Sequence, residues 1–312
     1  MIWSVSTAKM FERCQRQWFF KTQLASAKAK DEMRHRAWLL SKLQSLSAWR
    51  GNLVDQVLSH EVLPAFGQGR SITSDQALAS AMARFDRQLA VGRAHRLHEK
   101  GFNPTALGDD FVAFHVLEYG GVLDEAEVNR ARDEVRRAIQ SFFSMDELIA
   151  RLRTADRLIM QRALSFTHGG TAVRAVPDLI VFREGRPPAI VDWKVHVFGW
   201  RDAWLQLAVY AAALARGKAH SDFPVLEPFC ETDVGLLEVQ LLTGTLRRHR
   251  LTTEDVAQAD QFIARSFENM VLATGETNGK ASMLPPAEFP VTRYASNCEK
   301  CPYRVICWEE LQ

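Results

Sequence analysis

Two strand-like segments joined by a tight turn constrain the fold of this chain most strongly. Residues 175–182 (AVPDLIVF) and 189–195 (AIVDWKV) are rich in β-branched and aromatic residues, and the Gly and Pro residues between them indicate a turn. A hairpin of this kind brings Asp178, on the first strand, beside Asp192 on the second. Because side chains two apart on a strand share a face, Asp192 and Lys194 project together. The hairpin therefore predicts two carboxylates and an ammonium close together.

These three side chains suit a metal-dependent site. Asp178 and Asp192 would repel each other unless a cation lay between them, and Mg²⁺ or Mn²⁺ prefers oxygen ligands. Such a metal would polarise a phosphate and activate a water, while Lys194 would orient that water or offset charge on the phosphate. An isolated Asp-X-Lys is more often a surface ion pair. Here Asp192 has apolar neighbours, where an unpaired charge is costly, so we favour phosphodiester hydrolysis.

The first half of the chain has helical periodicity. The residues that bound the expected helices are Ser6 as an N-cap, Gly51 as a turn and Pro64 as a terminator. We expect the first helix to hold Cys14 among bulky apolar side chains. The expected helices cover residues 7–22, 31–63, 74–99 and 124–154.

The second half alternates strands with helices from about residue 157. Together with the helical first half, this order predicts an α/β protein with a mixed central sheet flanked by helices. Gly217 and Gly275 mark helix ends, and Thr243-Gly244 marks a hairpin turn. Besides the hairpin described above, we expect strands at 158–166, 234–242 and 245–251 and helices at 200–217 and 252–275.

The five cysteines indicate a metal site rather than a disulfide framework, because their number is odd and the chain has the character of an intracellular protein. Cys298, Cys301 and Cys307 form a C-x2-C-x5-C cluster that needs one more ligand to complete a tetrahedral set. Cys14 is the better candidate, and Cys230 is more often a buried small hydrophobe. Joining Cys14 to the cluster would close a loop of about 284 residues, a closure entropy of about 5 kcal/mol at most.

The hairpin resembles the PD-(D/E)XK nuclease superfamily. Pro177-Asp178 and Asp192-Trp193-Lys194 match the two parts of its defining motif. On the following helix, Gln206 and Tyr210 match the Q-x-x-x-Y element of the RecB-like branch, and they lie one turn apart on the same face. The resemblance implies a restriction-endonuclease-like core.

The resemblance also implies a role for each matched residue. The metal ligands would be Asp178, Asp192 and the main-chain carbonyl of Trp193, with Mg²⁺ or Mn²⁺ as the metal. Lys194 would assist hydrolysis. The substrate would be positioned by Gln206 and Tyr210.

The cysteines resemble those of the iron-sulfur subgroup of these nucleases, which includes the AddB nuclease domain and the CRISPR-adaptation nucleases. In that subgroup one cysteine lies near the start of the domain and three follow it, as Cys14 and the tail cluster do here. The resemblance implies a 4Fe-4S cluster bound by Cys14, Cys298, Cys301 and Cys307. Zinc is the alternative, because four thiolates suit it equally.

One element departs from the RecB-like pattern, which places a metal-binding histidine in a G-x-x-x-H helix. The corresponding string here runs from Gly51 to Asp55, and an aspartate is a competent ligand for a hard cation. We therefore expect Asp55 to join the metal ligands, with His60 or no residue of this helix as alternatives. His196 shares the strand face of Lys194 and could touch a phosphate, although such a histidine is usually a plain polar residue.

Charge and hydropathy limit how the protein could bind DNA and where in the cell we expect it. The net charge of +2 gives no global attraction to DNA, so binding must depend on local clusters such as those around Arg34, Arg93, Arg136 and Arg247. The longest apolar run, 207–215, is too short to span a membrane, and the N-terminus does not resemble a signal peptide, so we expect a cytoplasmic protein.

We divide the chain into N-terminal helices (1–64), a helical insertion (65–155), a nuclease core (156–280) and a cysteine-rich clamp (281–312).

Our first hypothesis is a metal-dependent DNA nuclease that acts on single strands or duplex ends. The chain has no Gly-rich phosphate loop of the ATPase type, so it would borrow a helicase or another motor from a partner. Relatives of this kind act in recombination and repair, CRISPR adaptation and antiviral defence. The alternative is a non-catalytic DNA-binding or scaffold subunit, and a zinc-stabilised interaction module ranks third.

Overall fold

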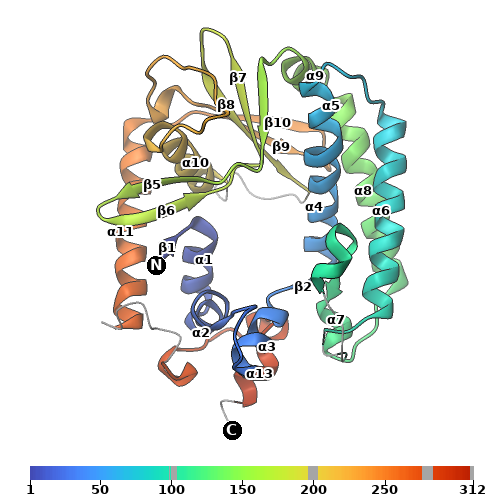
Figure 1. The fold of residues 1–312 in the computed structure, drawn as a ribbon, viewed down its shortest axis with the longest axis vertical. Helices are drawn as coiled ribbons and strands as arrows, with labels where there is room; N and C mark the ends of the chain where they lie inside the picture. The colour runs from blue at the N-terminus through green and yellow to red at the C-terminus, as the bar shows by residue number, and fades with distance from the viewer. Residues whose placement is uncertain (98, 100–103, 196–202, 276–283, 310–312) are drawn as a thin grey trace.

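The computed structural model of the chain describes residues 1–97, 99, 104–195, 203–275 and 284–309. A five-stranded mixed sheet lies at its centre, with strands in the spatial order β10-β9-β8-β7-β4 (Figure 1). β8 and β9 are parallel, and the other neighbours are antiparallel. The strands are β4 (Arg157–Met160), β7 (Leu179–Arg183), β8 (Arg186–Lys194), β9 (Gly235–Gln240) and β10 (Thr245–His249).

Two smaller sheets accompany the central one. The first is three-stranded in the order β1-β6-β5, and the second is the parallel pair β2-β3. The expected strand 158–166 divides at Gln161, whose φ of 49° turns the chain, so that its two halves join different sheets. The strands are β1 (Ile2–Trp3), β2 (Leu43–Gln44), β3 (Ala113–Phe114), β5 (Leu164–His168) and β6 (Thr171–Ala175).

One face of the central sheet packs on helix α10. Ile180, Ile190 and Leu236 point to this side and share a buried core with α10 and the N-terminal helices. The three-stranded sheet closes the same core (Figure 1). The elements on this side include α1 (Val5–Arg13), α2 (Gln15–Phe19), α10 (Trp204–Arg216) and α11 (Thr253–Thr274).

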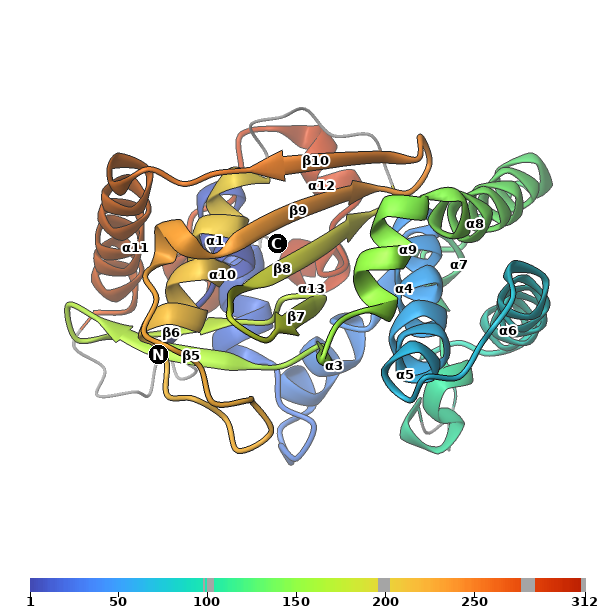
Figure 2. The same cartoon turned by 90° about the horizontal axis from the view of Figure 1, so that it is seen from above.

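The opposite face of the sheet packs on the helices of the N-terminal half. Val181, Val191 and Leu237 point to this side and form a second buried core. Helices α4, α5 and α9 lie next to the sheet, with α6 and α8 farther out (Figure 2). The bounds are α4 (Leu46–Val57), α5 (Leu63–Gly67), α6 (Ser74–Ala94), α8 (Glu125–Ser144) and α9 (Asp146–Arg153). The predicted mixed α/β fold with a helical N-terminal half is confirmed.

The region around α4 differs from the sequence prediction at two residues. Gly51 lies inside α4 and makes no turn. Pro64 does not end the helix either, because the π-helical turn Leu58–Val62 comes before it and Pro64 then occupies the first turn of α5. A proline is tolerated there because its missing N–H would have no helical partner. Asp55 is therefore held in the middle of a long helical segment.

The first helix also differs, and the difference concerns a cysteine. The expected helix 7–22 begins earlier, with Ser4 as its N-cap, and it breaks at Cys14, whose φ of −163° and ψ of 110° are extended. Sγ of Cys14 accepts a hydrogen bond from N–H of Gln17 at 3.4 Å and so caps α2. The break takes the thiol out of the helix instead of hiding it among apolar side chains.

The C-terminal segment consists of short helices beside α2. They are α12 (Ala295–Glu299) and α13 (Arg304–Glu309), and the short helix α3 (Glu32–Leu40) lies near them (Figure 1). Another short helix, α7 (His115–Glu118), follows β3. None of the described helices is long and apolar enough to cross a membrane.

Candidate active site

The site forms where β7 begins and β8 ends. Leu179 pairs with Val191, so Asp178 lies one residue before β7 and opposite Asp192. Asp178 is thus outside the strand on which the sequence placed it. Its Oδ2 accepts a hydrogen bond from N–H of Trp193 at 3.0 Å. Because β7 has not yet begun at this level, side chains from both faces of the sheet can meet here.

Asp192 is buried and paired with Lys194. Only 1% of Asp192 is exposed, and its Oδ2 lies 2.7 Å from Nζ of Lys194. Apart from this ion pair, neither carboxylate oxygen has a hydrogen-bond partner among the described residues. Burial raises the pKa of Asp192, while the Lys194 charge opposes that shift. A buried carboxylate whose oxygens have no partner except this one ammonium is a suitable ligand for a cation.

Helix α10 extends this arrangement through Gln206 and Tyr210. Nζ of Lys194 donates to Oε1 of Gln206 at 3.3 Å, and Nε2 of Gln206 donates to the Tyr210 hydroxyl. Burial and then the charges of Asp192 and Asp178 raise the pKa of Tyr210. The tyrosine therefore keeps its proton, and Lys194 has a fixed direction toward Asp192.

Asp55 reaches the site from α4. Its Oδ1 accepts hydrogen bonds from the indole Nε1 of Trp193 at 3.0 Å and from Nε2 of Gln161 at 3.0 Å. Gln161 also lies 3.5 Å from Oδ1 of Asp178, which makes it a bridge between the two carboxylates. Gln161 was not predicted, because its place depends on a positive φ that no sequence pattern marks. His60 lies instead beside Asp109, at 3.7 Å.

The electrostatics of the site favour a bound cation. Burial raises the pKa of Asp178 well above its ordinary value, and the charges of Asp192 and Asp55 raise it further. The Lys194 charge and the Trp193 N–H oppose this shift without cancelling it. Within the described ranges, no three His, Cys, Asp or Glu side chains are arranged as a ready metal site. The fit to a metal rests on Asp192, whose oxygens have no partner besides Lys194, and on the crowded carboxylates.

A second buried carboxylate lies behind Asp192. Glu238 is fully buried and pairs in register with Asp192 on the neighbouring strand. Its carboxylate lies 2.9 Å from Nε2 of His249 and 3.2 Å from Arg247, and it contacts Gln240. Part of the basic cluster 247–250 is thus used inside the protein. Glu238 was missed because an acidic residue in a hairpin strand gives no signal that it faces inward.

Arg50 connects the end of β8 to helix α8. Its Nη2 donates to the main-chain carbonyl of Val195 at 2.6 Å, and its Nη1 forms an ion pair with Glu134 of α8. Val195 directly follows Lys194, so this contact fixes the strand that carries the lysine. Residues 196–202, which include His196, lie outside the described residues.

The four predicted cluster cysteines line one narrow cavity: Cys14, Cys298, Cys301 and Cys307. Burial and, to a smaller extent, the charges of the neighbouring thiols raise the pKa of Cys301 to about 12. Arg16 lies 3.9 Å from the sulfur of Cys307. The thiols are close enough to influence one another, although they are not arranged as a closed metal site among the described residues.

Cys230 lies outside this cavity. It is exposed, and its Sγ lies 2.9 Å from Oδ2 of Asp233. The expectation that it is a buried hydrophobe is wrong, because the segment around it runs over the surface into a short 3₁₀ turn.

The remaining basic clusters are largely engaged with nearby acids or carbonyls. Arg93 pairs with Glu125, and Arg136 pairs with Asp133. Nε of Arg34 donates to the carbonyl of Leu24 at 3.1 Å. These arginines are therefore parts of folded surfaces rather than an obvious nucleic-acid track.

Three comparisons relate the chain to known proteins. A family model described as the PD-(D/E)XK nuclease superfamily matches residues 2–308. A search of curated proteins finds no match. Among solved structures, the crystal structure of SSO0001 is 12% identical with a TM-score of 0.31, covering 75% of this chain and 98% of that one. That of protein VC1899 from Vibrio cholerae is 12% identical with a TM-score of 0.25, covering 77% of this chain and 58% of that one.

Proposed function

Because the chain belongs to the PD-(D/E)XK nuclease superfamily, we propose that it is a divalent-metal-dependent deoxyribonuclease acting on single strands or duplex ends. The observation that carries this proposal is the juxtaposition of Lys194, at 2.7 Å from Asp192, with Asp178 across the strand pair. A carboxylate pair and a lysine in this arrangement suit phosphodiester hydrolysis.

The metal would be held by Asp178, Asp192, Asp55 and the main-chain carbonyl of Trp193. Mg²⁺ or Mn²⁺ would supply Lewis acidity toward a phosphate oxygen and lower the pKa of a bound water. Trp193 and Gln161 keep Asp55 oriented toward the other two carboxylates. Outer hydrogen bonds of this kind fix the direction of metal ligands.

Lys194 assists the reaction in this proposal. Its ammonium is held between Asp192 and Gln206, from where it can orient the attacking water or balance negative charge on the phosphate. Tyr210 remains a hydroxyl and fixes the amide of Gln206. Gln206 and Tyr210 would therefore position both the lysine and the substrate.

We place the protein in the RecB-like branch, with a 4Fe-4S cluster bound by the four cysteines that line one cavity. Thiolates must lose their protons to bind iron or zinc, and the raised pKa of Cys301 means that metal binding would release a proton there. Zinc is the alternative occupant. A helicase or similar motor from a partner would supply unwinding, and the pathway would be DNA repair, CRISPR adaptation or defence.

Cleavage assays on anaerobically purified protein test the proposal. Labelled single-stranded and duplex DNA is incubated with Mg²⁺ or Mn²⁺, with chelator, and with the Lys194→Ala variant. We expect metal-dependent cleavage that the variant loses. Cleavage that survives in chelator, or in Lys194→Ala with the fold intact, would contradict it.

The non-catalytic scaffold is the second candidate. Two observations favour it: Asp55 stands where the branch has histidine, and no ready three-ligand metal site is present in the described residues. It predicts DNA binding that needs no divalent metal and does not change in Lys194→Ala. The same assays, with binding measured beside cleavage, separate the two functions.

A further inference from the structure

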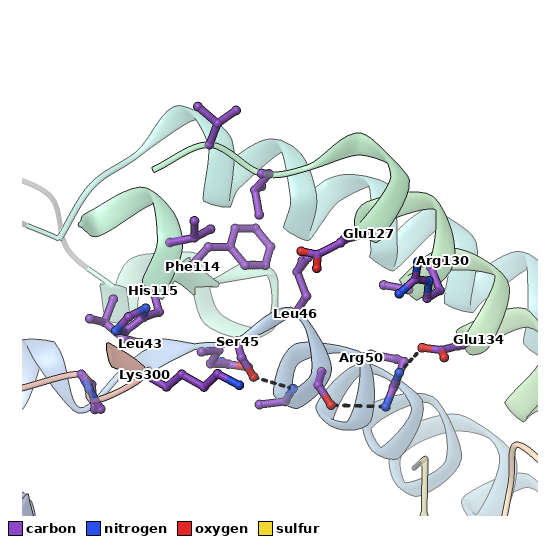
Figure 3. Close-up of a pocket in the computed structure, with 18 residues that line it drawn as sticks. Leu43, Ser45, Leu46, Arg50, Phe114, His115, Glu127, Arg130, Glu134 and Lys300 are labelled. Carbon is purple, nitrogen blue, oxygen red and sulfur yellow. Dashed lines mark hydrogen bonds and ion pairs between the residues drawn. The ribbon is translucent and has the colours of Figure 1, made fainter. Parts of the chain in front are cut away.

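A pocket of about 700 Å³ lies between the start of α4, the β2-β3 pair, α8 and the cysteine-rich segment (Figure 3). Pockets of about 300–1,000 Å³ are typical of sites for small organic ligands. None of the site residues discussed above except Arg50 and its partner Glu134 lines it. The pocket is therefore a separate feature that the carboxylate chemistry leaves unexplained.

The lining of the pocket combines an apolar surface with charged side chains. Leu46, Phe114 and Leu123 contribute the apolar part. Arg130 and Lys300 contribute two exposed cations that have no ion-pair partner among the described residues. Glu127 contributes an exposed carboxylate. A ligand with an apolar ring, a hydrogen-bonding edge and a negative group would match all three.

The charged side chains lie on two different walls of the pocket. Lys300 extends beside Ser45 at the first turn of α4, whereas Glu127 and Arg130 project from α8 on the other wall (Figure 3). Ser45 caps α4 by accepting a hydrogen bond from N–H of Ala48 at 3.2 Å. A phosphate between Lys300 and Arg130 would gain from both charges, and Glu127 could accept a hydrogen bond from a base amino group.

The pocket adjoins the carboxylate site through α4. Arg50 lines the pocket and also donates to the carbonyl of Val195, which follows Lys194. Arg50 and Asp55 are five residues apart on one helical segment, so they face different sides of the helix. The connection between the two places is therefore the 2.6 Å contact of Arg50 with Val195, the residue after Lys194. One ligand chain could therefore reach both places.

We infer that this pocket binds one nucleotide of a single-stranded DNA whose adjoining phosphodiester lies at Asp192 and Lys194. The inference rests on the proposed nuclease function and narrows its substrate to single strands. The base ring would lie on Leu46 and Phe114 and the phosphate between Lys300 and Arg130. A base inside a duplex cannot enter such a pocket, because its faces are stacked and its edge is paired.

The test measures DNA binding without cleavage. Fluorescence anisotropy of a short labelled single strand, in chelator, is compared for the wild type, the double variant Lys300→Ala/Arg130→Ala and the filling variant Ala48→Trp. The matched control is Lys218→Ala/Arg265→Ala, which removes two exposed charges away from the pocket. Thermal unfolding confirms that each variant folds.

We expect both pocket variants to bind the single strand about tenfold more weakly than the wild type and the control. The double variant should also reduce the slope of log K against log salt by about 0.7, because one neutralised phosphate contributes about 0.7 for single strands. Ala48→Trp should leave that slope unchanged, because it fills the pocket and removes no charge. Duplex DNA should bind the wild type more weakly than the single strand does.

Equal binding by the wild type and both folded pocket variants would overturn the inference. So would a loss of binding in the control pair as large as that in the pocket pair, because the effect would then reflect total charge. Cleavage measured with Mg²⁺ separates this result from the proposed function. If the proteins cleave DNA and the pocket variants bind the single strand as well as the wild type does, only the role of the pocket is refuted. If the pocket variants bind more weakly but none of the proteins cleaves DNA, only the proposed nuclease function is refuted.

Discussion

The carboxylate site and the cysteine cavity are built in different ways. At the carboxylate site, side chains from β8 and from two helices contact one another directly, as Lys194 contacts Asp192 and Gln206 and as Trp193 contacts Asp55. At the cysteine cavity, four thiols from the two ends of the chain line a narrow cavity between short helices. The first site is formed by contacts within the chain, whereas in our proposal the second is completed by a metal cluster bound to its thiols.

This difference has an energetic consequence. The strands around Asp192 belong to a sheet with apolar cores on both faces, so the fold maintains a crowded set of carboxylates at a cost. The helices α12 and α13 have only five and six residues, too few to be stable alone. We therefore expect a change at the carboxylate site to affect chemistry, and a change at the cavity to affect stability.

The largest effect should come from Asp192→Ala. This change removes the buried carboxylate that faces Lys194, and we expect the cleavage rate to fall by about a thousandfold or more. Iron or zinc content and the thermal unfolding midpoint should remain close to wild type. Parallel loss of the bound metal from the cysteine cavity would show that the two sites are not independent.

Cys14→Ser should lower stability and metal content, in contrast to Asp192→Ala, which should lower the cleavage rate. The variant should lose iron or zinc, and its free energy of unfolding should fall by about 3–5 kcal/mol, because the ends of the chain are no longer joined. Cys230→Ser is the matched control, since Cys230 is exposed and outside the cavity, and it should change neither quantity. A Cys14→Ser protein with full metal content and stability would remove Cys14 from the ligand set.

Trp193→Phe sharpens the comparison within the carboxylate site. The ring still packs, but the 3.0 Å hydrogen bond from the indole to Asp55 is lost, and we expect the affinity for Mn²⁺ to fall about tenfold. Trp49→Phe serves as control, because it loses a buried hydrogen bond to Gln88 in another region. Titration calorimetry should show weaker Mn²⁺ binding only for Trp193→Phe. Equal losses of Mn²⁺ affinity in the two variants would show that the cause is a general loss of stability, not the hydrogen bond to Asp55.

Asp178→Asn should have a smaller effect, on the pH dependence of stability. The folded pKa of Asp178 is raised, so the folded state retains a proton that the unfolded state loses as pH rises above the ordinary value of 3.8. Stability is therefore lost with rising pH, and the penalty is absent below that value. In chelator at neutral pH the variant should be more stable by about 1–2 kcal/mol, with the gain disappearing at acid pH. A variant less stable than wild type at neutral pH would contradict this assignment.

The sequence predicted the parts of the site that lie on regular elements. Asp192 and Lys194 share a strand face, and Gln206 and Tyr210 share a helix face, so spacing alone places each pair. The hairpin turn likewise indicated that Asp178 and Asp192 are neighbours. These relations depend on local backbone geometry. The spacing of a few residues along a strand or helix is enough to specify that geometry.

The parts that were missed depend on irregular backbone or on distant packing. Gln161 reaches Asp55 and Asp178 only because its φ is positive, and Cys14 leaves its helix only because the backbone there is extended. Arg50 and Glu238 are ordinary charged residues until the fold buries them. No local pattern distinguishes such residues from solvent-exposed ones, so their positions follow from the tertiary structure alone.

The most direct test of the central claim is Mn²⁺ binding measured by electron paramagnetic resonance alongside cleavage of single-stranded DNA. The proteins compared are the wild type, Asp192→Asn and Lys194→Ala. We predict that the wild type binds Mn²⁺ and cleaves, that Lys194→Ala binds Mn²⁺ without cleaving, and that Asp192→Asn does neither. Mn²⁺ bound equally well by Asp192→Asn, or cleavage retained in Lys194→Ala, would contradict the claim that these residues form a metal-dependent nuclease site.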